Sequence, residues 1–140
     1  MYVLDTNVIS ELRKVRSGKA DPKVADWVSE TRNEELFVSA VTMHELEYGV
    51  LLAMRADARK GALLRQWLDE GVTAAFRDRV LAVDEEVARR AAALHVPDPA
   101  PFRDALIGAT ALVRGMAVVT RNERDFVRFD ELEVVNPWRS

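Results

Sequence analysis

The sequence predicts an α/β fold in which a central, mostly parallel sheet is flanked by helices on both faces. Short apolar runs of the length of buried strands alternate along the chain with longer stretches whose apolar residues follow the helical period. Parallel strands need long, usually helical, connections between them, and such an alternation supplies these. The sequence shows no repeat and no linker. Residues 1–140 are therefore expected to form one domain, an α/β/α sandwich.

The first half of the chain is expected to hold two strands and most of the long helices. The strands are expected at residues 2–4 and 36–38, and the helices at 6–13, 22–32, 42–52 and 57–70. Asp21 followed by Pro22 is typical of a helix start, with the acid as N-cap. The last two helical stretches are compatible with one bent helix or with a helical hairpin.

The second half continues the alternation. Strands are expected at residues 79–83, at 116–119 and, at the edge of the sheet, at 132–135; helices are expected at 84–95 and 102–114. Asp84 is placed to cap the first of these helices, and Gly115 to end the second. Three prolines between residues 96 and 101 predict a rigid loop.

Composition narrows the classes of function. The formal net charge of −3 gives no support for a nucleic-acid partner, although local arginine clusters can serve one on an acidic body. The absence of cysteine excludes disulfides, a thiolate zinc site and a cysteine nucleophile. The first residues enter a strand without a basic and long apolar leader, and no stretch is long enough to span a bilayer. The expected location is therefore the cytoplasm.

Four acidic residues occupy similar places relative to the predicted elements. Asp5 directly follows the first strand, and Glu45, Asp104 and Asp125 each lie just beyond an apolar segment or in the first turns of a helix. Open α/β sheets collect their ligands at the carboxyl ends of the strands. The four carboxylates are therefore expected to converge, and they would repel one another unless a divalent cation joined them.

Each acid also has a purely structural interpretation. Asp5 is a favoured N-cap residue, and Glu45 completes a formal capping box that starts at Thr42. Asp104 lies where an acid complements a helix dipole, and Asp125 is compatible with a solvated position. Their common placement after strands favours a shared site over four independent structural roles.

A site built from oxygen ligands favours Mg²⁺ or Mn²⁺ over zinc. The chemistry that needs such a site is phosphodiester hydrolysis, in which the cation activates the attacking water. Thr6, Asn7 and Thr120 are placed to orient the carboxylates or the waters around them. The sequence contains no nucleotide-binding glycine motif, and the isolated His44 and His95 are not expected to be catalytic.

Several motifs together resemble the PIN-domain ribonucleases, and above all the VapC and FitB-like toxins of bacterial type II toxin–antitoxin pairs. The resemblance spans the whole chain and rests on Asp5-Thr6-Asn7, Glu45-Leu46 with Gly49, the run from Arg103 to Ala111, Val119-Thr120-Arg121-Asn122, Asp125-Phe126, and Asn136-Pro137-Trp138. It implies an α/β/α sandwich and an endoribonuclease that depends on Mg²⁺ or Mn²⁺. It also implies a homodimer that is inhibited by, and assembles further with, a VapB-like antitoxin.

The resemblance assigns the site residue by residue. Asp5, Glu45 and Asp104 match the three core acids of the family. Some relatives have a fourth acid where Asn122 stands, whereas here the carboxylate comes three residues later, at Asp125. Either residue can complete the site, and one or two metal ions remain compatible with it.

RNA contacts would have to come from local positive charge. Basic residues gather after the first helix, at Arg13, Lys14, Arg16 and Lys19, and around the fourth acid, at Arg121, Arg124 and Arg128. Ordinary solvated surface residues would give the same pattern. Two rival hypotheses are a catalytically silent PIN-like module that binds an antitoxin-type partner and a DNA nuclease of related fold. The three intact core acids argue against the first rival, and the short chain argues against the second.

Overall fold

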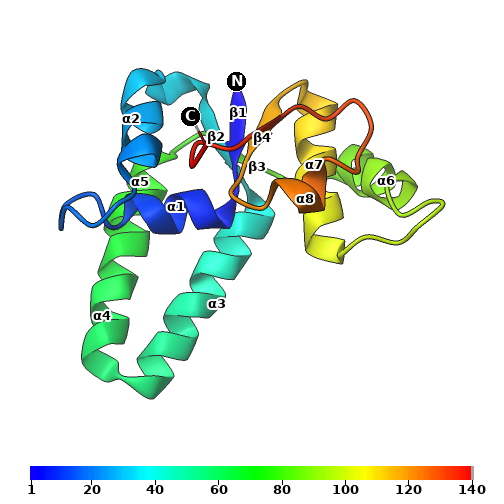
Figure 1. The fold of residues 1–140 in the computed structure, drawn as a ribbon. Helices are drawn as coiled ribbons and strands as arrows, with labels where there is room; N and C mark the ends of the chain where they lie inside the picture. The colour runs from blue at the N-terminus through cyan, green and yellow to red at the C-terminus, as the bar shows by residue number, and fades with distance from the viewer. Residues whose placement is uncertain (140) are drawn as a thin grey trace.

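A computed structural model describes residues 1–139 of the protein. Its centre is a five-stranded sheet in the order β3-β2-β1-β4-β5, and every neighbouring pair of strands is parallel (Figure 1). The strands are β1 (Tyr2–Leu4), β2 (Leu36–Ser39), β3 (Val80–Leu81), β4 (Ala117–Val119) and β5 (Val134–Val135). The chain runs outward from β1 first to one edge and then to the other. The carboxyl end of β1 is therefore the switch point at which such sheets bind ligands.

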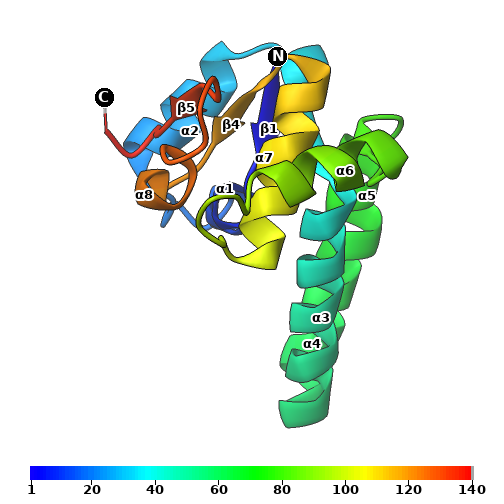
Figure 2. The ribbon, with the colours of Figure 1, turned by 90° about the vertical axis from the view of Figure 1, so that its right-hand side faces the viewer.

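Helices cover both faces of this sheet, which confirms the predicted α/β/α arrangement (Figures 1 and 2). One face carries α1 (Thr6–Leu12), α2 (Pro22–Glu30), α3 (Ala40–Ala56) and α4 (Ala58–Gln66), with the short segments η1 (Asn33–Glu35), η2 (Trp67–Val72) and α5 (Thr73–Ala75). The other face carries α6 (Glu85–Ala93) and α7 (Phe102–Arg114). A single turn, α8 (Glu123–Phe126), follows β4.

Two hydrophobic cores lie on opposite sides of the sheet because side chains alternate along each strand. Val3 and Val118 pack with Ile107 of α7 in one core. Leu4 and Val119, their immediate neighbours in sequence, belong to the other core, which is built with α1, α3 and η2. All four strand residues are fully buried. Burial on both faces fixes the register of the central strands and, with it, the place where each strand ends.

The helix after β2 begins earlier than the sequence suggests. Ser39 is its N-cap and accepts a hydrogen bond from the Val41 N–H at 3.0 Å. Thr42 and Glu45 therefore lie inside α3, and the interpretation of these two residues as a capping box is wrong. Glu45 has no capping task at a helix end, which leaves its carboxylate available to the site described below.

The two helical stretches between residues 40 and 66 form a hairpin, not one bent helix. Asp57 ends α3 and caps α4, where its carboxylate accepts from the N–H groups of Arg59 and Lys60. The hairpin extends away from the sheet (Figure 2). Its arms approach closely at Gly61, where an added Cβ would meet the backbone of Met54.

The remaining helix boundaries largely agree with the sequence. Asp21 and Asp84 cap α2 and α6 as predicted. Gly115 ends α7 with a positive φ of 67°, a conformation that suits glycine. The strands β3 and β5 are two residues each, shorter than expected. Between residues 1 and 139, no helix combines the length and the apolar character needed to cross a membrane.

Candidate active site

Three acidic side chains from three elements converge beside the carboxyl end of β1. Asp5 follows β1 and is the N-cap of α1, Glu45 lies on α3, and Asp104 lies in the first turn of α7. The parallel sheet fixes the first of these positions, and the helices that pack on its two faces bring in the others. These three residues will be called the acid cluster.

The acid cluster surrounds the guanidinium group of Arg103. Its Nε lies 2.5 Å from an oxygen of Glu45, and its Nη1 lies 2.5 Å from an oxygen of Asp104. Its Nη2 forms an ion pair with Asp5. One positive group thus joins all three carboxylates. Arg103 belongs to the motif that carries the family resemblance, but nothing in the sequence indicated this role.

The Asp5 carboxylate is fully buried and held by several donors. It accepts hydrogen bonds from the Thr6 N–H and from the Thr120 hydroxyl, each at 2.7 Å, and a longer one from the Asn7 amide at 3.4 Å. The same carboxylate therefore both caps α1 and belongs to the cluster. The two interpretations of Asp5 are compatible, and the donors fix the direction of its oxygens.

Glu45 is positioned by Thr6. The Thr6 hydroxyl donates to a Glu45 oxygen at 2.5 Å and also lies 3.3 Å from the hydroxyl of Thr42. Because the Thr6 backbone N–H binds Asp5, one residue links two acids of the cluster. The structure thus places Thr6, Asn7 and Thr120 in contact with the carboxylates they were expected to orient.

Asp104 is almost completely buried, with 5% of its surface exposed. Burial raises the pKa of Asp104, and the negative charges of Asp125 and Asp5 raise it further. The hydrogen bond and the positive charge of Arg103 lower this pKa, but the net direction is upward. Burial disfavours the charged form of Arg103, but its contacts with Glu45 and Asp5 prevail and raise the Arg103 pKa. The cluster therefore carries more negative charge than one arginine neutralises.

The fourth expected acid is placed differently from the other three. Asp125 lies on α8 and is exposed; within residues 1–139 its carboxylate makes no hydrogen bond or ion pair. It influences the site through its charge, which acts on Asp104. Asn122 is also exposed, and its backbone N–H donates to the Thr120 hydroxyl at 3.0 Å. The structure gathers three of the four acids around one point and leaves Asp125 at the rim.

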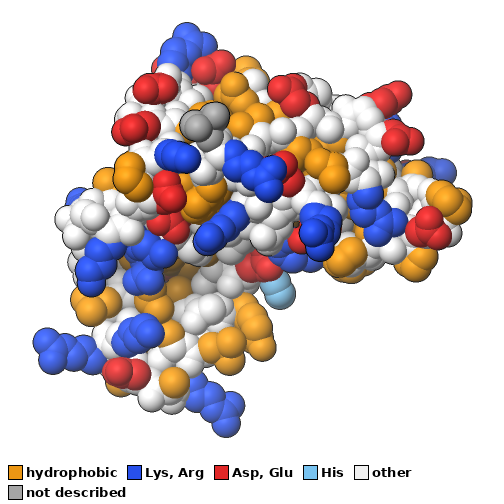
Figure 3. Space-filling model, viewed as in Figure 1, with side chains coloured by type: hydrophobic (Ala, Val, Ile, Leu, Met, Phe, Trp, Pro, Cys, Tyr) orange, Lys and Arg blue, Asp and Glu red, His pale blue; other side chains and the backbone are white. Residues whose placement is uncertain are grey.

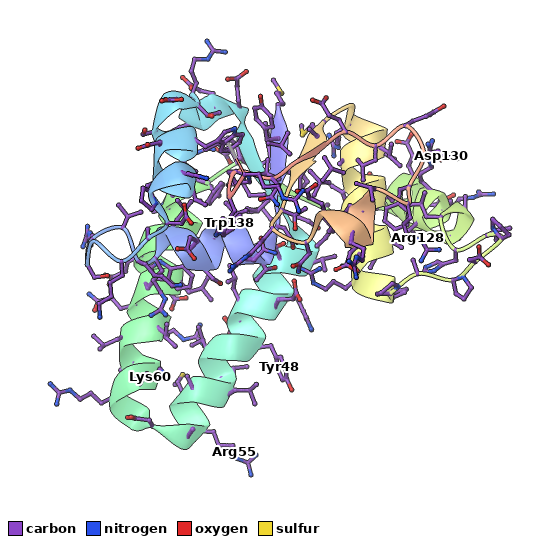
Figure 4. All side chains as sticks on the ribbon, viewed as in Figure 1. Tyr48, Arg55, Lys60, Arg128, Asp130 and Trp138 are labelled. Carbon is purple, nitrogen blue, oxygen red and sulfur yellow. The ribbon has the colours of Figure 1, made fainter. Side chains whose placement is uncertain are left out.

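A depression of about 430 Å³ opens beside the acid cluster. Glu45 and Arg103 line it together with basic and polar side chains, among them Lys14, Arg121 and Asn122. The guanidinium of Arg121 lies over the ring of Trp138, 5.5 Å from the ring centroid. Basic side chains are spread across the middle of this face of the molecule, where Trp138 also lies (Figures 3 and 4).

Arg128, which was expected to contact RNA, is engaged elsewhere. Its guanidinium donates to the backbone carbonyls of Asp98 and Pro99, at 2.7 and 3.2 Å. It therefore holds the proline-rich loop that precedes α7 (Figure 4). A structural task of this kind is not visible in a sequence, where Arg128 and Arg121 look alike.

The ligand atoms of the acid cluster are of the kind that hard divalent cations prefer. All its donors are carboxylate oxygens, they come from three separate elements, and they already surround one positive group. With Arg103 between them, no three acidic or histidine side chains in the described part of the chain are arranged to hold a metal ion. A cation at this point would take the place of the guanidinium.

The comparison with protein families gives a match to the PIN domain over residues 2–132. This chain belongs to the PIN-domain family. The match covers nearly all of the chain and confirms the resemblance seen in its motifs.

Individual relatives agree with this assignment. The PIN domain is 36% identical to the VapC ribonuclease Y4jK of Sinorhizobium fredii, over 99% of this chain and 98% of the relative. It is 33% identical to the toxin FitB of Neisseria gonorrhoeae, over 99% of both chains. The crystal structure of FitAcB from Neisseria gonorrhoeae superposes on it with a TM-score of 0.89 and 30% identity, covering 100% of both chains. Sequence and fold therefore point to the same toxin and ribonuclease relatives.

Proposed function

We propose that this PIN domain, residues 1–140, is an endoribonuclease that depends on Mg²⁺ or Mn²⁺ and acts as the toxin of a type II toxin–antitoxin pair. The observation that carries the proposal is the convergence of Asp5, Glu45 and Asp104 on one cationic group. The names of the relatives, a VapC ribonuclease and the toxin FitB, support the RNA substrate and the toxin role.

The acid cluster would hold the cation, with Asp125 adding negative charge at the rim. A bound Mg²⁺ or Mn²⁺ supplies a water of lowered pKa and stabilises charge on the phosphate. Thr6 and Thr120 keep the carboxylate oxygens directed at the site through the bonds described above. Asn122 lies beside the same network and is the second candidate for the fourth position.

Positive groups near the cluster would hold the RNA backbone. Lys14 and Arg121 flank the depression beside Glu45, where a phosphate next to the cation would lie. The Trp138 ring supports the guanidinium of Arg121 and reduces its freedom. These groups would contact the phosphate backbone, which is the same in every RNA. The choice of RNA would therefore depend on other parts of the surface around the site.

The proposed partners are a VapB-like antitoxin and a second copy of the chain, and the proposed place of action is the cytoplasm. The full-length similarity to the toxin FitB supports a partner of this class. A largely apolar groove of about 730 Å³ lies between α3 and α7 and suits a homodimer contact. Tyr48 and Phe102 border it and are 59% and 74% exposed; Tyr48 points away from α4 (Figure 4).

One observation favours the alternative of a catalytically silent binding module. Arg103 already neutralises part of the cluster, and in this arrangement the described acids do not form a metal site. If the arginine were permanent, the domain would bind partners without cleaving RNA. Cleavage assays separate the two functions.

The test is cleavage of total cellular RNA by the purified protein, free of antitoxin, with Mg²⁺, with Mn²⁺ and with EDTA. We expect discrete fragments that require the cation, and none from single- or double-stranded DNA. Asp5→Asn should abolish cleavage, because it removes a buried charge at the centre of the cluster. Asp26→Asn is the matched control, since Asp26 is exposed on α2, outside the site. Failure of the folded wild type to cut any RNA would support the silent module.

A further inference from the structure

Arg103 contacts all three acids of the cluster and carries a charge of the same sign as a metal ion. Its three guanidinium nitrogens each face a different carboxylate: one acid follows β1, one lies on α3 and one lies on α7. A planar guanidinium with fixed donors suits such bridging far better than a lysine would. The contacts are therefore specific and not a chance approach of a surface arginine.

The charges around Arg103 do not balance. The acid cluster carries three negative charges, and Asp125 acts on it from the rim, against one positive charge. A divalent cation would neutralise the same carboxylates more completely. The two positive groups cannot occupy the centre of the cluster together, because their charges repel at such a distance.

Arg103 lies at the solvent side of the acid cluster. Its side chain is 31% exposed, whereas the side chains of Asp5 and Asp104 are 0% and 7% exposed. Every side-chain hydrogen bond that it makes within residues 1–139 is to the acid cluster or to Thr6 beside it. It also borders both the depression beside the cluster and the groove between α3 and α7. The carboxylates of Asp5 and Asp104 are held in the buried part of the site, whereas Arg103 and Glu45, which is 30% exposed, lie at its open side.

We propose that Arg103 is an intramolecular counter-ion that holds the acid cluster together without metal and competes with the divalent cation for it. Cation binding then requires the guanidinium to move out toward the depression. Arg103 is in this sense a positioning residue that sets the metal affinity of the site. The proposal rests on the proposed function, because it assumes that the acid cluster binds Mg²⁺ or Mn²⁺.

The test measures Mn²⁺ affinity by calorimetry on the metal-free protein and on three variants. Arg103→Gln removes the charge, and Arg103→Lys keeps the charge but cannot bridge three carboxylates. Arg114→Gln is the matched control: Arg114 is exposed at the far end of the same helix, α7, and its loss changes the net charge equally. We expect Arg103→Gln to bind Mn²⁺ about tenfold more tightly than the wild type, with a smaller gain for Arg103→Lys. Arg114→Gln should stay within about twofold of the wild type, because distant charges are screened.

A second readout follows the arginine itself. In the metal-free protein the Arg103 Nε–H donates to Glu45 and should give a distinct resonance in a ¹⁵N spectrum; Arg103→Gln assigns it. Titration with Mg²⁺ should remove or strongly shift this signal. Thermal denaturation in EDTA should show Arg103→Gln less stable than Arg114→Gln, because its carboxylates repel without a counter-ion.

The outcomes separate the two proposals. If folded Arg103→Gln and Arg103→Lys bind Mn²⁺ no more tightly than the wild type, competition by Arg103 is overturned while the metal site stands. If the Arg103 signal is unchanged at saturating Mg²⁺, displacement is overturned. If neither the wild type nor any variant binds Mn²⁺, the metal site and the proposal both fail.

Discussion

At the scale of single residues, the acid cluster shows how one side chain serves both the fold and the site. Asp5 caps α1 and is also buried in the cluster. Thr6 opens α1 and connects Asp5 to Glu45. Substituting such residues is expected to affect both activity and stability. A test of the catalytic role therefore needs a variant that loses activity but keeps its stability.

Asp104→Asn is that variant. We expect it to lose cleavage by about 100-fold or more, because it removes a carboxylate that would bind the cation. It should nevertheless fold, and in EDTA near neutral pH it should be at least as stable as the wild type. The reason is the raised pKa of Asp104, caused first by burial. A raised pKa means that the ionised carboxylate costs stability above that pKa, and an amide does not carry this cost.

RNA cleavage and thermal denaturation in EDTA over a range of pH check this prediction. The stability advantage of Asp104→Asn should shrink as the pH falls through the Asp104 pKa, because the wild-type carboxyl then becomes neutral as well. Full cleavage by the variant would show that Asp104 is not part of the chemistry.

Glu11 gives a pH dependence of the opposite sign. It is 8% exposed and accepts from the Asp21 N–H at 2.8 Å and from the Lys14 ammonium at 3.1 Å. The bond from the Asp21 N–H lowers the pKa of Glu11, against the effect of burial, and Lys14 lowers it further. The ionised form therefore stabilises the fold at pH values above the ordinary range of a glutamate, and this contribution is lost as the pH falls through the lowered pKa.

We accordingly expect Glu11→Gln to cost about 1 kcal/mol of unfolding free energy near neutral pH. The difference from the wild type should fade in acid, below about pH 4. Urea denaturation at both pH values measures it. A difference that persisted unchanged in acid would mean that the carboxylate charge is not what joins α1 to the segment before α2.

At the scale of elements, the sequence predicted those features that depend on local chemistry. The caps Asp21 and Asp84, the stop at Gly115 and the strands of the sheet's centre all follow from neighbouring residues. The start of α3 could not be predicted in this way, because Ser39 and Thr42 are both good capping residues; in the structure Ser39 is the cap and Thr42 contacts Thr6 instead.

In the candidate site too, some residues could be placed from the sequence and others could not. Asp5 can be placed from the sequence, since it directly follows a strand and a parallel sheet brings strand ends to one edge. Arg103 cannot, because a long side chain has many directions and only the assembled fold shows which one it takes. The same holds for Asp125, whose short helix, α8, keeps it at the rim of the site.

The α3–α4 hairpin offers a test at this scale. An added Cβ at Gly61 would meet the Met54 backbone, which cannot move without separating the arms. We expect Gly61→Ala to lower the unfolding free energy by about 1–3 kcal/mol, as overpacking does. Gly49→Ala is the control, because its Cβ meets nothing within 4 Å, and it should raise helix stability by up to about 1 kcal/mol. Chemical denaturation compares the two; equal effects would contradict the close contact between α3 and α4.

At the scale of the whole molecule, the candidate site depends on topology. The central position of β1 puts Asp5 at the switch point of the sheet, and the layers on its two faces contribute Glu45 and Asp104 from opposite sides. No single element holds two acids of the cluster. Binding of a cation, or of Arg103 in its place, therefore joins both layers to the sheet and should stabilise the molecule as a unit.

The most direct test of the metal site is a crystal structure of the antitoxin-free protein with Mn²⁺, using anomalous diffraction to locate the ion. We predict an anomalous peak about 2.1 Å from carboxylate oxygens of Asp5 and Asp104, close to Glu45, with the Arg103 guanidinium moved out of the cluster. A structure with saturating Mn²⁺ that shows no ion there, and Arg103 still bound to all three acids, would contradict the account.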